Sequence, residues 1–301
     1  MGKGTEFRAD FGDMAAGARI RRISGSTSVL GEGPLWDERL QRLYWVDIES
    51  GAVRCCAADG SDAAVWQIGE KISCIAFRHD RPGFVCGLQS SIATFTLDPL
   101  TVRVIAAPET AASDNRCNDG KCDSAGRFWV GTCDQTSRRP SGYLYRVDPD
   151  HRVVRAAGPF ICANGPAFAP DGQTLYCVDS YGRTIFAFDV DRVGNLSRQR
   201  ILIRFEDPAW GYPDGLTCDS TGCIWVAHWG GWRVSRFSAE GKLLETIPVP
   251  VSQPTSCTFG GAKLNTLFIT SASLGLAEGV EPHAGAVFSI DLDVEIGRAH
   301  V

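Results

Sequence analysis

One pattern recurs six times along this chain: a turn, a short strand rich in aromatic and aliphatic residues, and a further strand of alternating character. The central residues of the aromatic strands are Trp45, Val85, Trp129, Tyr176, Trp225 and Phe268. Successive steps between them are 40, 44, 47, 49 and 43 residues. Units of this size that hold several antiparallel strands are the blades of a β-propeller. The sequence therefore predicts an all-β fold, a six-bladed β-propeller with four-stranded antiparallel blades around a central channel.

The repeat occupies most of the chain without a break, which predicts a single propeller domain over residues 18–296. Within it, segment 18–23 is expected to add an outer strand to the sixth blade and so close the ring, because closure removes exposed strand edges. Residues 1–17 are polar and without period, and we expect a disordered leader or tag there. Residues 297–301 are expected to be a tail.

Composition excludes several classes of function. The 301 residues include 30 Lys and Arg against 35 Asp and Glu, a net charge of −5 without a basic run. This charge is typical neither of nucleic-acid binding nor of binding to anionic membranes. No apolar run approaches about 18 residues and no secretory signal is found at the start, which predicts a cytoplasmic protein. Nothing in the sequence marks an oligomer interface, and we expect a monomer or weak oligomer. Twelve cysteines without a Cys-x-x-Cys motif are expected to be buried, reduced thiols.

The innermost strands can be aligned by one buried residue in each repeat. These packing residues are Trp36, Phe77, Cys122, Phe168, Cys218 and Phe259. Four positions earlier the chain has side chains that all carry an oxygen, namely Glu32, Ser73, Asn118, Asn164, Asp214 and Thr255. Because innermost strands run alongside the channel, their equivalent ends should meet at one mouth of it.

Two interpretations of the residues Glu32, Asn164 and Asp214 remain open at this point. Asn-Gly and Asp-Gly are common turn signals, and Asn164 and Asp214 are each followed by glycine. Alternatively, two carboxylates and an amide held together call for a cation among them. Oxygen ligands without Cys or His suit a hard cation such as Ca²⁺, Mg²⁺ or Mn²⁺.

Several short motifs in a fixed order carry a family resemblance. They are Leu30-Gly-Glu-Gly-Pro34, Asn115-Arg-Cys-Asn-Asp-Gly-Lys121, Asn164-Gly-Pro166, Pro213-Asp-Gly215, Trp225-Val-Ala-His-Trp-Gly-Gly231 and Cys257-Thr-Phe-Gly-Gly261. Together they resemble the regucalcin (senescence marker protein)/gluconolactonase family of sugar lactonases over roughly residues 25–293. The resemblance implies a six-bladed propeller that hydrolyses aldonolactones with one divalent cation in its channel.

The resemblance also implies roles for five residues. By their motifs, Glu32, Asn164 and Asp214 match the family's metal ligands, and Arg116 and Asn118 match its substrate-binding pair. The expected cofactor is one divalent cation, Ca²⁺ first, with Zn²⁺, Mn²⁺ or Mg²⁺ as alternatives. The small-molecule substrate would be a sugar lactone, opened by water that the cation activates, and Asp214 is the candidate general base.

The chain departs from animal family members after Gly131-Thr132, where they carry an acidic residue that helps hold the sugar. Asp134, Gln135 or Thr136 is a candidate for that role. Arg138 and Arg139 follow, either as a solvated loop or as contacts to an anionic or bulkier lactone. His228 is expected to be a partly buried structural residue, although it follows a strand that ends near the channel mouth.

Two other functions are alternatives to a metal-dependent lactonase. One is a non-catalytic propeller that binds Ca²⁺ or a partner, which the presence of Arg116 and Asn118 beside the metal triad disfavours. The other is an aryl-ester or organophosphate hydrolase on the same scaffold, which should have a more apolar pocket.

Overall fold

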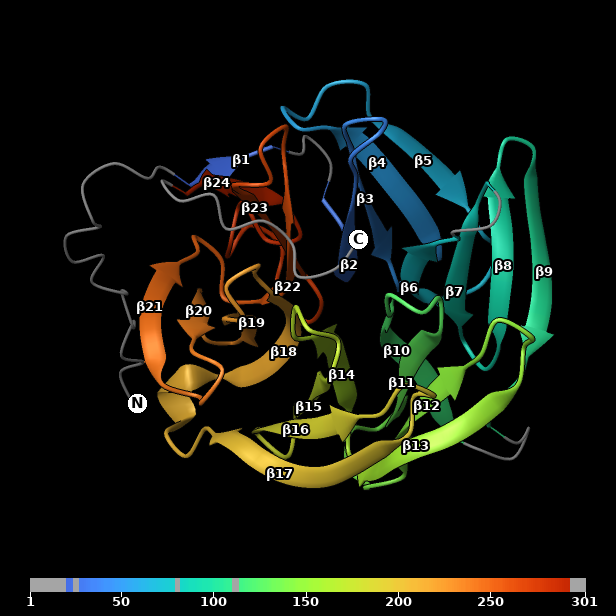
Figure 1. The fold of residues 1–301 in the computed structure, drawn as a ribbon. Coiled ribbons are helices and arrows are strands. Elements are labelled where there is room, and N and C mark those ends of the chain that lie inside the picture. Colours follow the sequence, from blue (N-terminus) through green and yellow to red (C-terminus); the bar gives the residue numbers. More distant parts are fainter. Residues whose placement is uncertain (1–19, 24–26, 79–81, 110–113, 293–301) are drawn as a thin grey trace.

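Six four-stranded antiparallel sheets stand around a central axis in a computed structural model of the chain (Figure 1). The structure describes residues 20–23, 27–78, 82–109 and 114–292. The predicted six-bladed propeller is therefore confirmed. The predicted leader (1–17) and tail (297–301) lie outside the described residues, and the domain limits stay a prediction.

Each blade is a meander in which the first strand is innermost and the fourth lies at the rim. Blade 1 consists of β2 (Gly31–Asp37), β3 (Arg42–Asp47), β4 (Ala52–Ala57) and β5 (Ala64–Gln67). Blade 2 consists of β6 (Ile72–Phe77), β7 (Phe84–Leu88), β8 (Ile92–Leu97) and β9 (Leu100–Ala106). Blade 3 consists of β10 (Asn115–Cys122), β11 (Phe128–Asp134), β12 (Gly142–Val147) and β13 (Val153–Phe160).

The second half of the ring repeats this plan. Blade 4 consists of β14 (Ala163–Phe168), β15 (Thr174–Asp179), β16 (Thr184–Val190) and β17 (Leu196–Arg204). Blade 5 consists of β18 (Tyr212–Cys218), β19 (Ile224–Trp229), β20 (Arg233–Phe237) and β21 (Leu243–Pro248), preceded by a 3-10 helix (Pro208–Trp210). Blade 6 consists of β22 (Pro254–Gly260), β23 (Thr266–Ser271), β24 (Phe288–Asp291) and β1 (Arg21–Arg22).

The ring closes where the two ends of the propeller meet. The outer strand β1 pairs antiparallel with β24, with Arg21 opposite Ser289 and Arg22 opposite Phe288. Blade 6 thus combines strands from both ends of the chain, which confirms the predicted closing strand. No sheet edge is left at the junction between the first and last blades.

Aromatic side chains fill the spaces between neighbouring blades. The predicted central tryptophans Trp129 and Trp225 are both fully buried. Their indole rings contact the next blade through Phe168 at 5.9 Å and Phe259 at 5.6 Å between ring centroids. This regular packing explains why the aromatic residues recur at blade-length intervals in the sequence.

All twelve cysteines are described, and none of them is in a disulfide. Ten are buried, in agreement with their predicted role as small packing residues. In the described part of the chain, no helix is long and apolar enough to cross a membrane.

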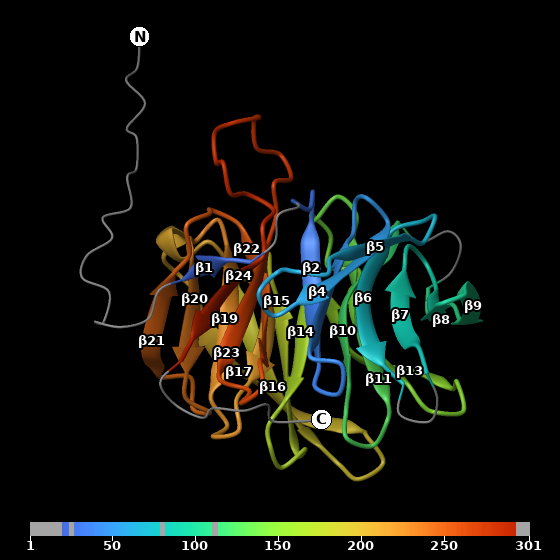
Figure 2. The same ribbon diagram turned by 90° about the horizontal axis from the view of Figure 1, so that it is seen from above.

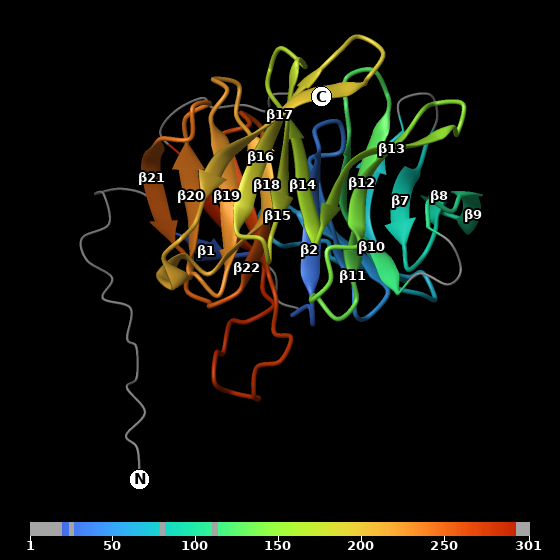
Figure 3. The same ribbon diagram turned by 90° about the horizontal axis from the view of Figure 1, so that it is seen from below.

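The two ends of the channel differ in their loops. All innermost strands start at one mouth, and the loops after each second strand return to that same mouth because the blades are antiparallel. The loop between β23 and β24 is the longest of these and projects from that face (Figures 2 and 3). We call this end the loop mouth.

Candidate metal and substrate site

Every innermost strand contains a bulge at the predicted polar position. In β2, Glu32 is opposite Val46 whereas Leu35 is opposite Tyr44, so one extra residue is accommodated between them. The other five innermost strands show a register shift at the equivalent place. A bulge re-aims side chains and interrupts the ladder locally, and such bulges often lie beside functional sites.

The six aligned side chains are all nine-tenths or more buried. They are Glu32, Ser73, Asn118, Asn164, Asp214 and Thr255, with exposures between 0% and 6%. The structure therefore places the predicted set at one level of the channel, near the loop mouth. Asn164-Gly165 and Asp214-Gly215 lie inside strands, so neither is a hairpin turn.

Glycine after the polar residue lets the neighbouring blade come close. Gly165 has a φ of 60°, and a Cβ there would lie 2.8 Å from Cγ of Leu216 in blade 5. A Cβ on Gly215 would collide with Ser256 in blade 6. In both pairs the polar side chain faces the channel and a glycine must follow it. At Gly165 the backbone has a positive φ, and at Gly215 the neighbouring blade is too close for a Cβ.

Glu32, Asn164 and Asp214 come together from blades 1, 4 and 5. The Nδ2 of Asn164 donates to Oδ1 of Asp214 and to Oγ of Ser180, the latter at 3.0 Å. The Oδ1 of the same amide is buried and has no hydrogen-bond partner. Among the described residues, the hydrogen-bond donor to Oε2 of Glu32 is the adjacent N–H of Gly33, at 2.9 Å. Oxygen acceptors therefore outnumber the donors that reach them.

The electrostatics of this cluster favour a positive charge. Burial raises the pKa of Glu32 well above its ordinary range, and the carboxylates of Asp214 and Asp119 raise it further. Burial likewise raises the pKa of Asp214, with Asp119 adding to the shift and Arg116 opposing it. Three buried carboxyl groups thus destabilise one another's charged forms.

The residues present fit a hard divalent cation. An orphaned buried amide oxygen beside two carboxylates supplies oxygen ligands only, the donor set that Ca²⁺ and Mg²⁺ prefer. No three His, Cys, Asp or Glu side chains gather as a metal site in the described ranges, and here the third ligand would be an amide. A cation would also relieve the repulsion between Glu32 and Asp214.

Asp119 is a member of this cluster that sequence reasoning did not single out. It is 3% exposed, its Oδ1 accepts the N–H of Gly120 at 2.8 Å, and its Oδ2 is buried without a partner. The signal was available, because Asp119 directly follows Asn118 in the Asn115–Lys121 motif. It was hidden because Asp119-Gly120 has the form of a turn.

Arg116 and Asn118 lie beside the cluster and hold each other in place. Nη1 of Arg116 donates to Oδ1 of Asn118 at 2.7 Å and to the carbonyl of Cys117 at 2.9 Å. Nδ2 of Asn118 donates to the carbonyl of Ala163 in blade 4 at 3.0 Å. The guanidinium therefore has a fixed orientation and brings a positive charge to the carboxylates.

The surroundings of Asp134, at the end of β11, differ from the expectation that this residue holds the sugar. Asp134 is fully buried, and its carboxylate accepts the backbone N–H groups of Arg138 and Arg139 at 3.0 and 3.1 Å. The carboxylate also forms an ion pair with the Arg139 guanidinium at 2.7 Å and accepts a hydrogen bond from the Thr136 hydroxyl. The Asp134 candidate is therefore wrong, because its buried carboxylate is used to fold the loop, whereas the role of the exposed Thr136 stays a prediction. Gln135 remains exposed.

The two arginines of this loop have different surroundings. Arg139 binds Asp134 and Asp114, each through Nη2. Arg138 is exposed on the same loop, at the loop mouth. Of the two, Arg138 is the one that a bound anion could use.

His228 is part of the core. It is fully buried, with ring centroids 5.2 Å from Phe205 and 5.4 Å from Trp210. Burial lowers its pKa to about 3, so the imidazole is neutral near pH 7. The prediction that it is structural is consistent with this environment.

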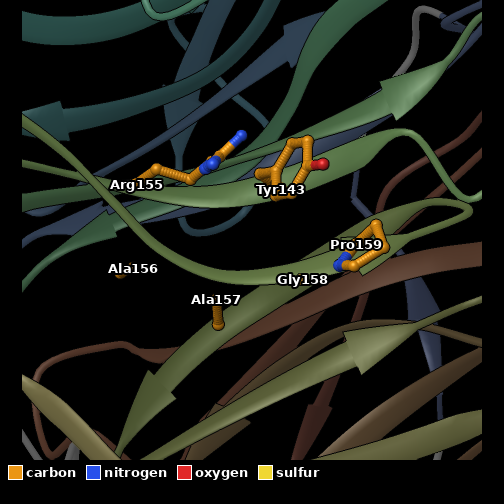
Figure 4. Close-up of a pocket in the computed structure, with 6 residues that line it drawn as sticks. All are labelled: Tyr143, Arg155, Ala156, Ala157, Gly158 and Pro159. Atoms are coloured by element: carbon orange, nitrogen blue, oxygen red, sulfur yellow. The ribbon is translucent and has the colours of Figure 1, made fainter.

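One shallow groove on the surface lies away from the channel. It has a volume of about 330 Å³ and is lined by Tyr143, Arg155 and residues 156–159 of the outer strands β12 and β13 (Figure 4). The guanidinium of Arg155 lies 4.6 Å from the centre of the Tyr143 ring. This groove contains no carboxylate and none of the site residues described above.

Comparison with known proteins decides the family. The family model described as "SMP-30/Gluconolactonase/LRE-like region" matches residues 30–273. The chain belongs to this family. The match includes all six aligned channel positions, from Glu32 to Thr255.

Named members of the SMP-30/gluconolactonase family are similar over nearly their whole length. A 6-deoxy-6-sulfogluconolactonase of Pseudomonas putida is 38% identical over 254 residues, covering 84% of this chain and 87% of that protein. An L-arabinolactonase of Azospirillum brasilense is 37% identical over 274 residues, covering 88% and 89%. The crystal structure of a calcium-binding protein, regucalcin, from Agrobacterium tumefaciens superposes with a TM-score of 0.88, 25% identity and coverage of 94% and 96%.

Proposed function

We propose that this protein is a lactonase that opens the ring of a sugar lactone to the sugar acid, with one divalent cation in the propeller channel. The observation that carries the proposal is the cluster of Glu32, Asn164 and Asp214, in which a buried amide oxygen without a donor lies beside two buried carboxylates. Family membership supports the activity, since relatives named as lactonases act on the lactones in their names.

Glu32, Asn164 and Asp214 would hold the cation, and Ca²⁺ is the first candidate. The set contains two carboxylates and an amide, and Ca²⁺ accepts such oxygen ligands with loose geometry. When bound, the cation supplies a Lewis acid that polarises a carbonyl oxygen and makes water more acidic. The regucalcin structure that superposes on this chain is described as calcium-binding, which favours the same ion here.

Asp214 is the proposed general base. Its Oδ1 already accepts the Asn164 amide, which leaves Oδ2 to take the proton of the attacking water. The same oxygen can then return that proton to the ring oxygen as it leaves, so the base regenerates within one turnover.

Arg116 is proposed to hold and stabilise the substrate. Its guanidinium is fixed by Asn118, and its remaining N–H groups can donate to the lactone carbonyl oxygen as that atom becomes negative. Because the guanidinium is already oriented, little reorganisation is needed when the substrate arrives. Asn118 positions Arg116 and keeps its own Nδ2 on the neighbouring blade.

A lactone panel tests the proposal. Metal-depleted protein with and without added CaCl₂ is given five- and six-membered sugar lactones, with a hydroxyl or an anionic group at carbon 6, and acid release is followed. We expect cation-dependent hydrolysis of at least one sugar lactone, faster than in buffer. If no lactone on the panel is opened above the buffer rate, the proposed function is wrong.

A further inference from the structure

Two cysteines of neighbouring blades face each other beside the proposed substrate residues. Cys133 lies near the end of β11 in blade 3, and Cys162 immediately precedes β14 in blade 4. The two residues form an isolated antiparallel β-bridge. The N–H of Asp134 donates to the carbonyl of Ile161 at 3.3 Å, which makes Cys133 and Cys162 a non-hydrogen-bonded pair.

This backbone arrangement suits a covalent link between the two sulfurs. In a non-hydrogen-bonded antiparallel pair the Cα atoms are about 4.5 Å apart and the side chains lie on the same face. A disulfide accommodates Cα separations of about 4.4 to 6.8 Å. The bridge between Cys133 and Cys162 therefore directs both sulfurs to one face, where they can reach each other.

The Cys133 thiol has a lowered pKa, unlike the packing cysteine Cys218. The hydrogen bond from Cys162 lowers its pKa to about 7, and the positive charge of Arg116 adds to the effect, against the opposing effect of burial. Burial instead raises the pKa of Cys218, which lies at the packing position of blade 5. Thiolate is the nucleophilic form of cysteine, so this pair differs from the packing cysteines.

The pair is connected to both proposed substrate residues. Nδ2 of Asn118 lies 3.5 Å from Sγ of Cys162, and the backbone of Arg116 is opposite Cys133 in the β10–β11 ladder. Cys133 and Cys162 are 1% and 6% exposed, so only a small reagent is expected to reach them.

We propose that Cys133 and Cys162 are an oxidisable dithiol site that takes hydrogen peroxide and closes to a disulfide in the wall of the channel. The Cys133 thiolate attacks one peroxide oxygen, the O–O bond breaks, and the leaving hydroxide takes up the proton that the Cys133 thiol released, which gives water. The resulting sulfenic acid is attacked by the Cys162 sulfur, the S–O bond breaks, and hydroxide leaves with the Cys162 proton as a second water. Two thiols are oxidised by two electrons, and the peroxide is reduced to two waters.

Closing the disulfide would change the proposed active site. The Cys162 sulfur would move toward Cys133 and away from the Asn118 amide, and the β10–β11 ladder that carries Arg116 would be strained locally. A displacement of about 1 Å in a substrate-positioning group can cost up to about 100-fold in rate. We therefore expect a reversible rise in KM for the lactone in the oxidised protein, and this part of the inference rests on the proposed function.

The test uses the full-length, calcium-loaded protein treated with hydrogen peroxide in steps, with and without later dithiothreitol. Free thiols are blocked, and tryptic peptides are examined by mass spectrometry for a link between peptide 128–138, which contains only Cys133, and peptide 156–183. Fragmentation distinguishes Cys162 from Cys177 in the second peptide. Cys133→Ser and Cys162→Ser are the test variants, and Cys177→Ser is the control for a buried cysteine outside the pair.

We expect the linked peptide in the wild type and in Cys177→Ser, its loss after dithiothreitol, and its absence in both test variants. Absence of the link in the wild type, or a link through Cys177, would overturn the inference. Formation of the link in a protein that opens no lactone would overturn the proposed function and leave the dithiol site intact. A linked protein with unchanged KM would overturn the effect on the substrate residues.

Discussion

The same repeat position has two different roles in different parts of the ring. In blades 2 and 6 this position is occupied by a residue whose hydroxyl links neighbouring blades. Oγ of Ser73 donates to the carbonyl of Asn118 at 2.8 Å, and Oγ1 of Thr255 donates to the carbonyl of Gly31 at 2.5 Å. Both bonds cross to the following blade. These two side chains are buried and satisfied.

In blades 1, 4 and 5 the equivalent side chains turn toward one another instead. Asn164 keeps a buried oxygen without a donor, and the pKa values of Glu32 and Asp214 are raised by burial and by neighbouring carboxylates, Asp119 among them. The propeller fold places one side chain of each blade at the same level of the channel. Whether a position stabilises the ring or forms a binding site depends on the chemistry of the residue that stands there.

The largest effect is expected from Asp214→Ala. Loss of the proposed base and of one ligand should lower kcat by at least about 1,000-fold, since general-base catalysis alone contributes about 100- to 10,000-fold. Steady-state hydrolysis of the best lactone measures it, and circular dichroism checks the fold. Ser73→Ala, at the same repeat position in blade 2, is the matched control and should keep its turnover. Equal losses of kcat in the two variants would contradict the distinction between the structural position in blade 2 and the site position in blade 5.

A second prediction concerns the cation. Glu32→Gln keeps the shape of the side chain but removes one of two proposed anionic ligands, and it should weaken Ca²⁺ binding by at least about tenfold because affinity follows ligand charge. Isothermal titration calorimetry on metal-depleted protein measures this without any substrate. Unchanged Ca²⁺ affinity in this variant would remove Glu32 from the site.

Thr255→Val should give the opposite profile to Glu32→Gln. The valine fills the same space but leaves the carbonyl of Gly31 without the Thr255 hydroxyl donor, which should cost about 1–3 kcal/mol in the free energy of unfolding. Urea denaturation of the metal-depleted protein measures the cost, and Ca²⁺ affinity should stay at the wild-type value. A large loss of Ca²⁺ affinity with an unchanged free energy of unfolding would mean that Thr255 is part of the cation site.

The smallest effect is expected outside the channel, at Arg138. Because an exposed ion pair is worth about 0.2–1 kcal/mol, Arg138→Ala should raise KM for a lactone with an anionic group at carbon 6 by less than about fivefold. KM for the neutral analogue should not change, and the ratio of the two KM values measures the contact. If both KM values rise together, Arg138 supports the structure of the loop and does not bind the anionic group at carbon 6.

Much of this arrangement could be predicted from the sequence because a propeller is a repeat. Spacing of the aromatic strands predicted six blades, and alignment on Trp36 and Phe168 placed Glu32 and Asn164 at equivalent positions. Both residues lie at bulges of innermost strands. The closing strand Arg21–Arg22 was also predicted, since a ring has to hide its last edge.

Other features depend on contacts that a repeat does not encode. The burial of Asp134 under Arg139 follows from the path of one irregular loop, so its polar character was mistaken for a substrate contact. The contact between Cys133 and Cys162 arises where two blades meet, far from the repeat alignment. Sequence patterns describe single blades well and the seams between blades poorly.

The central claim is that hydrolysis requires one cation held by Glu32, Asn164 and Asp214. Its most direct test is a titration of Ca²⁺ into metal-depleted protein in which binding and lactone opening are measured on the same samples. We expect turnover to rise from the buffer rate in proportion to the occupancy of a single Ca²⁺ site. Asp214→Ala should show no such rise. Full lactonase activity in excess chelator would contradict the account.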